Sequence, residues 1–220
     1  NIEKEEFVAI MGPSGSGKST LLNLISGILP ITSGEITIAG KNVSNLSEKE
    51  AAEFRRDQLG FVFQDFNLVD TLTIQENIML PLMLHNTSVS KMKKKSTSIA
   101  HQLGIEKVLS NRVYEVSGGQ AQRAAIARAI IHHPKLILAD EPTGNLDSAS
   151  AKDVMNIFSR LNKQEKVSTI IVTHDAKTAS YCNRVIFIKD GAVHSEIYKD
   201  SNQIQFYDEI LNVLKVIGGI

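Results

Sequence analysis

The stretch from Gly12 to Ser19 has the residue types and the spacing that phosphate binding requires. It reads Gly-Pro-Ser-Gly-Ser-Gly-Lys-Ser, and its glycines let the backbone curl until successive N–H groups point at one anion. Lys18 supplies a positive charge for the β- and γ-phosphates of a nucleotide, and the Ser19 hydroxyl can ligate Mg²⁺. A helix that begins directly after the loop adds the positive end of its dipole. We therefore predict nucleotide binding by Gly12, Pro13, Ser14, Gly15, Ser16, Gly17, Lys18, Ser19 and Thr20.

Two acidic residues follow an apolar run that begins at Leu136. Asp140 ends this run and Glu141 comes directly after it. Because sheets of parallel strands bind ligands at the carboxyl ends of their strands, we expect Asp140 to hold Mg²⁺ there, through water. Glu141 can orient and deprotonate an attacking water molecule. Many strands end in aspartate, so the pair becomes informative only together with the phosphate-binding loop.

The elements that must position these residues alternate between strand and helix. Alternation of this kind implies a mostly parallel sheet with helices on both faces. Short apolar runs predict strands at residues 7–11, 59–63, 136–140, 168–172 and 184–189, with an exposed strand at 34–38. Helical spacing and capping residues predict helices at 18–26, 47–56 and 148–162.

The middle of the chain, about residues 65–131, is predicted to be a helical subdomain inserted into this α/β core. Thr73 with Glu76 forms the pattern of a capping box and starts one helix. Two more helices are expected at residues 90–103 and 117–131. We expect one domain over residues 1–220, because this length suffices for a single core.

Composition narrows the classes of function. Lys plus Arg equals Asp plus Glu at 24 each, which argues against a nucleic-acid partner held by bulk positive charge. No apolar run approaches the roughly 18 residues that span a bilayer. Cys182 is the single cysteine, so no intrachain disulfide forms, and we expect it to be buried. The run of Lys91, Lys93, Lys94 and Lys95 indicates either a solvated helix face or contact with anionic lipid head groups.

A second phosphate-binding pattern lies at residues 116–120, Val-Ser-Gly-Gly-Gln. Ser117 and the amides of Gly118 and Gly119 stand at a predicted helix N-terminus, where they can surround a γ-phosphate. With the following Ala121-Gln122-Arg123, the stretch resembles the signature of ATP-binding cassette (ABC) proteins, in which Leu replaces Val116. The resemblance implies an α/β fold with a P-loop NTPase core, a mostly parallel sheet and a small antiparallel β part. It also implies that the second pattern binds the ATP of a partner copy.

Three further motifs of the ABC family follow in its usual order. Gln64 resembles the Q-loop glutamine, residues 144–147 (Gly-Asn-Leu-Asp) the D-loop, and His174 the switch histidine that contacts a γ-phosphate. The resemblance covers essentially the whole chain. It implies catalytic roles for Glu141, His174 and Lys18, and Mg²⁺ contacts for Ser19, Gln64 and Asp140. To the loop residues it adds nucleotide contacts from Gln64, Ser117, Gly118, Gly119, Gln120 and Asp147.

The chain departs from the family pattern at two places. ABC ATPases usually stack adenine on an aromatic residue in a strand before the phosphate loop, whereas Phe7 has the pattern of a core strand residue. We expect the stacking residue in a segment upstream of Asn1. Glu5 stands where the family commonly has a turn glycine, and a positive φ there would strain it mildly.

The resemblance extends to one branch of the family. Residues 64–73 and 140–147 resemble ATPases that drive permeases with large extracytoplasmic portions, and residues 179–191 resemble bacitracin- and lantibiotic-resistance ATPases. The tail, about residues 201–220, adds to this likeness, or it forms an amphipathic helix packed on its own domain.

We therefore expect a head-to-tail dimer that hydrolyses ATP and powers a separate integral-membrane permease in antimicrobial-peptide export or resistance. Its place would be the cytoplasmic face of the cell membrane. The alternatives are a non-transporting regulator of the cell envelope or division, and a lipoprotein-release or macrolide-export ATPase. A soluble ABC protein acting on DNA or ribosomes is disfavoured, because the chain has no long coiled-coil insertion, no second cassette and no basic excess.

Overall fold

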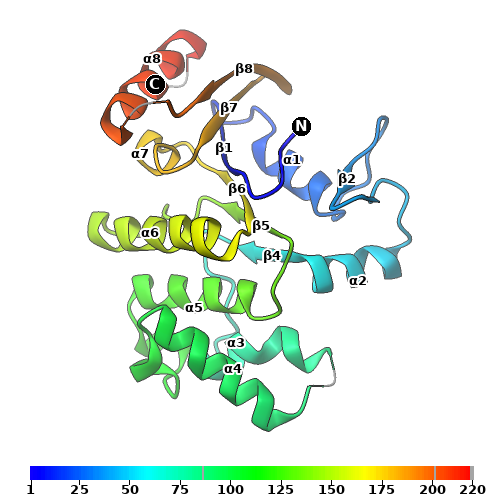
Figure 1. The fold of residues 1–220 in the computed structure, drawn as a ribbon, viewed down its shortest axis with the longest axis vertical. Coiled ribbons are helices and arrows are strands. Elements are labelled where there is room, and N and C mark those ends of the chain that lie inside the picture. Colours follow the sequence, from blue (N-terminus) through cyan, green and yellow to red (C-terminus); the bar gives the residue numbers. More distant parts are fainter. Residues whose placement is uncertain (86, 201, 219–220) are drawn as a thin grey trace.

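The computed structural model describes residues 1–85, 87–200 and 202–218, which form a six-stranded sheet flanked by helices (Figure 1). Five strands are parallel, and the last pairs antiparallel with its neighbour. In spatial order the strands are β4 (Leu59–Val62), β5 (Leu136–Asp140), β6 (Ser168–Val172), β1 (Phe7–Met11), β7 (Arg184–Lys189) and β8 (Ala192–Tyr198).

The central strands are buried on both faces, which explains why they read as continuous apolar runs. All five residues of β1 are buried, and neighbouring residues point to opposite faces of the sheet. Ala9 and Met11 belong to one core cluster, whereas Ile10 belongs to a second cluster on the other face. The predicted bounds of β1, β5, β6 and β7 are confirmed.

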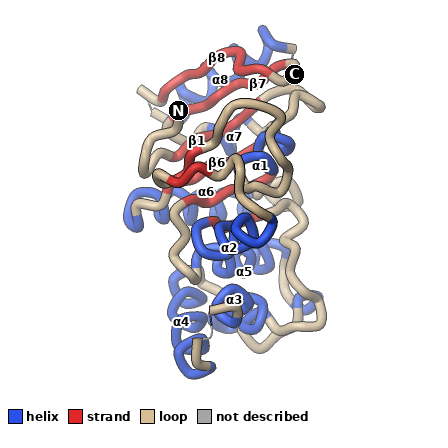
Figure 2. Tube along the Cα trace, turned by 90° about the vertical axis from the view of Figure 1, so that its right-hand side faces the viewer, coloured by secondary structure: helices blue, strands red, loops and turns tan. Residues whose placement is uncertain are grey.

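Helices cover each face of the sheet (Figure 2). Side chains from three long helices pack in the first cluster: α5 (Gly118–Ile130), α6 (Ser148–Glu165) and α8 (Gln203–Ile217). Leu22 of α1 (Lys18–Ile25) and Phe54 of α2 (Glu48–Gln58) pack in the second cluster. The parallel strands therefore end together at one edge of a sandwich that is closed on both sides.

The region predicted as a helical subdomain contains α3 (Ile74–Met83), α4 (Val89–Gln102) and α5, with 3₁₀ turns η1 (Glu106–Val108) and η2 (Val113–Glu115). Thr73 caps α3, and the predicted capping box with Glu76 is confirmed. A second capping box joins Ser117 to Gln120 at the start of α5. These helices lie at one end of the molecule in Figure 1, beyond the edge strand β4. The subdomain limits of about 65–131 stay a prediction.

One prediction about local structure needs correction, and two elements were missed. The strand expected at residues 34–38 is only β2 (Thr37–Ile38), which pairs with β3 (Lys41–Asn42). The intervening Ala39 and Gly40 have φ of 50° and 80°, so a tight two-residue turn of the primed type limits this hairpin. The edge strand β8 and the short helix α7 (Ala176–Ala179) were not predicted.

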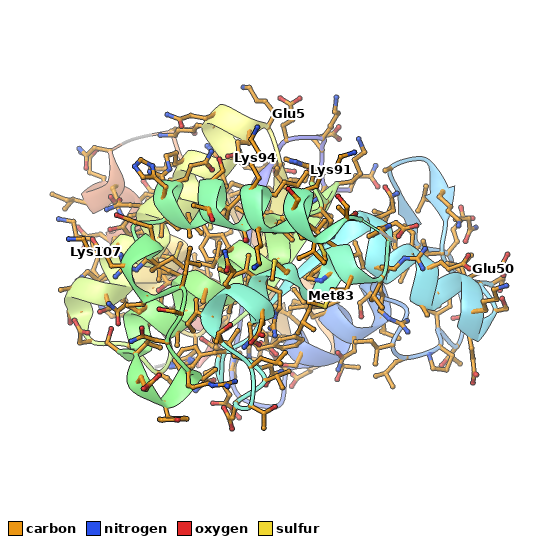
Figure 3. The ribbon with its side chains drawn as sticks, turned by 90° about the horizontal axis from the view of Figure 1, so that it is seen from below. Glu5, Glu50, Met83, Lys91, Lys94 and Lys107 are labelled. Atoms are coloured by element: carbon orange, nitrogen blue, oxygen red, sulfur yellow. The ribbon has the colours of Figure 1, made fainter. Side chains whose placement is uncertain are left out.

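Several side chains lie where the sequence indicated. Cys182 is buried, and this burial raises the pKa of its thiol. Glu5 has a φ of 64°, so the expected strained turn is present. The four lysines of α4 are exposed, and Lys91 and Lys94 can be seen on this helix in Figure 3.

The tail forms α8 and packs on its own domain through four buried residues: Phe206, Ile210, Leu214 and Ile217. Ser201, Gly219 and Ile220 of the predicted tail lie outside the described residues. In the part of the chain that the structure describes, no helix combines the length and apolarity needed to cross a membrane.

Candidate active site

The phosphate-binding loop connects the end of β1 to the start of α1. A Cβ atom on Gly12 would lie 2.0 Å from the carbonyl oxygen of Ile188, so the backbone passes β7 at a distance that only glycine permits. Gly17 has a φ of 96° and forms the N-cap of α1. The loop is therefore held by close packing against β7, and its amides precede a helix N-terminus.

Lys18 places its ammonium group inside this loop. Its Nζ donates hydrogen bonds to the carbonyl oxygens of Gly12 at 2.9 Å and Pro13 at 2.8 Å. A third, longer bond of 3.5 Å reaches the Ser16 Oγ, and within the described residues no carboxylate forms an ion pair with Lys18. An anionic phosphate in the loop would compensate that charge, which is the arrangement predicted from the sequence.

Ser19 and Asp140 meet at the carboxyl edge of the sheet. The Ser19 Oγ lies 3.5 Å from the Asp140 Oδ1, and Asp140 is the last residue of β5. Partial burial raises the pKa of Asp140, an effect that the Ser19 hydroxyl partly opposes. A hydroxyl and a carboxylate are hard oxygen ligands, and a cation would compensate the half-buried charge. The pair therefore fits Mg²⁺.

Glu141 and His174 lie in direct contact. The Glu141 Oε1 accepts hydrogen bonds from the backbone N–H of His174 at 2.9 Å and from its Nδ1 at 2.7 Å. The Oε2 accepts a bond of 3.0 Å from the Thr173 hydroxyl. Glu141 also has a φ of 44°, a strained conformation for a residue with a side chain. Its carboxylate is therefore fixed by the residues that follow β6.

Gln64 contacts the predicted D-loop of the same chain. Its Nε2 donates to the Asn145 Oδ1 at 3.0 Å, and the Asn145 amide donates in turn to the Asp65 Oδ1 at 2.8 Å. A Cβ atom on Gly144 would lie 3.0 Å from the Gln64 Cδ, so the two loops touch closely. Asn145 had no predicted role beyond its place in the motif, because its partners are about 80 residues away along the chain.

The segment after Gln64 is strained and is anchored by α5. Phe66 and Asn67 have φ values of 61° and 48°, uncommon for residues other than glycine. The Arg128 guanidinium donates to both of their carbonyl oxygens, at 2.9 Å for Phe66. Burial lowers the pKa of Arg128 from its usual value. Arg128 was not predicted from the sequence, where it reads as one more helical residue.

Ser117 and Asp147 belong to a separate cluster. Ser117 caps α5, and Asp147 caps α6 by accepting from the amides of Ala149 and Ser150. A Cβ atom on Gly119 would lie 2.8 Å from the Ser150 Oγ, so the two helix starts are in contact. In the described chain, no hydrogen bond joins this cluster to the phosphate loop. The structure thus separates the predicted site residues into two groups. Lys18, Ser19, Asp140, Glu141 and His174 lie at the carboxyl edge of the sheet or in the loop beside it, whereas the residues from Ser117 to Gln120 lie with Asp147 at the starts of α5 and α6.

Comparison with known proteins shows the family of this chain. A family model described as ABC transporter matches residues 1–144. The chain belongs to the ABC transporter family. This ABC chain is 60% identical over 219 residues to the ABC transporter ATP-binding protein YxdL of Bacillus subtilis (strain 168), across 100% of the chain and 85% of YxdL. It is 47% identical over 220 residues to the bacitracin export ATP-binding protein BceA of Halalkalibacterium halodurans, across 100% of the chain and 87% of BceA.

A solved structure has the same fold. It is the dimeric structure of a post-hydrolysis state of the ATP-binding cassette MJ0796 bound to ADP and Pi, with a TM-score of 0.84 and 40% sequence identity. The similarity covers 91% of this ABC chain and 88% of the other. The predicted P-loop NTPase fold and ABC resemblance are therefore confirmed, and the chain is an ABC-type ATPase that binds ATP.

Proposed function

We propose that this ABC ATPase hydrolyses Mg-ATP between two copies of itself and drives an integral-membrane permease in antimicrobial-peptide export or resistance. The copies pair head to tail, so that each ATP lies between the phosphate loop of one copy and the Ser117–Gln120 cluster of the other. The subunit acts at the cytoplasmic face of the membrane.

One observation supports the dimer: the phosphate loop and the Ser117–Gln120 cluster lie at the starts of two different helices, and in the described residues no hydrogen bond joins them. Gly17 precedes α1, and Ser117 caps α5, so each of them has the amides of a helix N-terminus. Each γ-phosphate needs stabilising from both sides, and the second side is free in a single copy. A head-to-tail pair brings the loop and the cluster together twice, with one nucleotide in each interface.

The residues at the sheet edge then have distinct roles. Lys18 exchanges its carbonyl partners for the β- and γ-phosphates. Glu141 accepts the proton of the attacking water, and its orientation is fixed by Thr173 and His174. His174 keeps its Nδ1 on Glu141 and presents the other ring nitrogen to the γ-phosphate. Ser19, Asp140 and Gln64 would hold Mg²⁺, and this ion would neutralise charge on the phosphates.

The peptide substrate class rests on similarity. BceA is named a bacitracin export protein, and its 47% identity spans the whole of this chain.

We infer that the permease partner contacts the segment from Phe66 to Leu72, whose strained start is anchored to α5 by Arg128. Closure of the dimer would move α5 and hence this segment.

The decisive experiment uses Glu141→Gln. The amide retains the shape of the side chain but cannot take a proton from water, so ATP hydrolysis should fall by about 10²-fold or more. The variant should bind ATP and dimerise in its presence, as measured by light scattering after gel filtration. A variant that stays monomeric in saturating Mg-ATP would refute the head-to-tail model.

A matched variant and a membrane experiment complete the test. Lys18→Ala removes the charge in the loop and should lose ATP binding in equilibrium titrations, so unchanged affinity would contradict the role of Lys18. The Glu141→Gln protein should co-purify from membranes with a large permease. Bacitracin or a lantibiotic should stimulate the ATPase activity of the wild-type pair, whereas a permease bound to division proteins would indicate a regulator instead.

A further inference from the structure

Gln122 lies on the second turn of α5 and is completely buried. Its Nε2 donates hydrogen bonds to two backbone carbonyl oxygens, those of Phe63 at 3.3 Å and of Pro142. Its Oε1 is also buried and has no hydrogen-bond partner within the described residues. One amide group from α5 therefore bridges two loops that are about 80 residues apart in the chain.

Both carbonyl groups adjoin residues of the proposed active site. Phe63 directly precedes Gln64 after β4, and Pro142 directly follows Glu141 after β5. The strands β4 and β5 are parallel neighbours, so the two loops leave the same edge of the sheet. Gln122 is thus bonded beside the Q-loop glutamine and beside the proposed catalytic base at the same time.

The Gln122 amide joins two segments of the chain and does not only fill space. Its Nε2 satisfies the carbonyl groups of Phe63 and Pro142, which would both lose this donor if an apolar side chain replaced the amide. Glu141 has a strained backbone, and such a conformation persists only where its surroundings determine it. The bond to Pro142 is one of the contacts that fix the chain on the carboxyl side of Glu141.

We propose that Gln122 is a positioning residue, which couples the helix that carries the Ser117–Gln120 cluster to the backbone on either side of the active site. When the partner's nucleotide engages the start of α5, Gln122 passes the displacement to the Gln64 loop and to the loop after Glu141. This inference rests on the proposed function, because it requires the nucleotide of a partner copy to bind at the start of α5. Gln122 itself takes no part in a chemical step.

The test compares Gln122→Met with a matched control, Asn162→Leu. Asn162 is also a buried amide that bridges two carbonyl oxygens, of Glu5 at 2.8 Å and Val167 at 3.1 Å, but it lies on α6 near the amino end of β6. Both substitutions remove two donated bonds at nearly constant volume. Only Gln122→Met should affect catalysis, with kcat about tenfold lower and the KM for ATP within about twofold of the wild type.

Three results would overturn the coupling role of Gln122. Wild-type kcat in Gln122→Met, a higher KM with unchanged kcat, or an equal loss of kcat in Asn162→Leu would overturn the coupling role. If Gln122→Met does not fold, Gln122→Asn is the variant that tests the inference. Its shorter amide should reach at most one of the two carbonyl oxygens, so kcat should still fall. A wild-type kcat in Gln122→Asn would overturn the inference. Absence of ATPase activity in the wild-type protein would instead reject the proposed function.

Discussion

Gly60 of β4 permits the close approach of α5 to the sheet, and its substitution by alanine should destabilise the protein strongly. A Cβ atom at this position would lie 2.4 Å from the carbonyl oxygen of Ala129 and 3.2 Å from the Cγ of Pro134. Real Cβ contacts are essentially never shorter than 3.0 Å. The obstructing atom belongs to the backbone of α5, so no side-chain rotation can relieve the overlap.

Overpacking of this kind costs typically 1–3 kcal/mol, and we expect about 3 kcal/mol because a helix must move. In a domain of this size each kcal/mol lowers Tm by about 2–4 °C, which predicts a loss of about 6–12 °C. The same movement displaces Gln122, so ATPase activity below Tm should fall as well.

Differential scanning calorimetry of Gly60→Ala measures this loss, and Gly40→Ala serves as the control. Gly40 has a φ of 80° and open space where a Cβ atom would lie, so alanine there meets only backbone strain, about 1–2 kcal/mol. A fall in Tm for Gly60→Ala that does not exceed the fall for Gly40→Ala would refute the packing argument.

Two further predictions concern the site edge and the helical region. Burial raises the pKa of the Asp140 carboxyl in the folded protein. The protonated carboxyl therefore contributes most to stability below the unfolded pKa of about 3.9, and this contribution is lost as the pH rises through the folded pKa. Asp140→Asn should therefore melt above the wild type at pH 7 without metal, and the difference should shrink toward pH 4. An unchanged difference across this range in fluorescence melting would contradict the burial effect. Thr73→Ala removes the N-cap of α3, and should cost about 1 kcal/mol, or about 2–4 °C in Tm, whereas Thr73→Ser should not. Equal melting of all three proteins would contradict the capping role.

The buried elements could be predicted from the sequence because their signals are local. The strand β5 is a continuous apolar run whose predicted bounds hold, and the capping box of Thr73 and Glu76 marks the start of α3. By contrast β8 is largely exposed, with polar and apolar residues mixed, and it forms by pairing with β7. The four residues of α7 are too few to show helical periodicity.

The residues of the candidate site also differ in whether a local sequence signal reveals them. The phosphate loop and the acidic end of β5 are contiguous motifs, so their residues could be named from the sequence. The partners of Asn145 and Gln122 could not, because their hydrogen bonds join segments brought together only by the sheet. Gln122 lies in the stretch that resembles the ABC signature, but that resemblance does not reveal which carbonyl groups its amide meets.

The strand order has a consequence for how the protein is made. The first strand, β1, pairs with β6 and β7, with Phe7 opposite Thr169 and Val8 opposite Arg184. On a ribosome β1 must therefore wait for about 160–180 further residues before its neighbours emerge, and such long-range pairing is intrinsically slow. Gly12 takes its position against Ile188 only after β7 is in place. The nucleotide-binding loop is thus among the first segments synthesised and among the last to acquire its shape, so a nascent chain should bind ATP only when its sheet is complete.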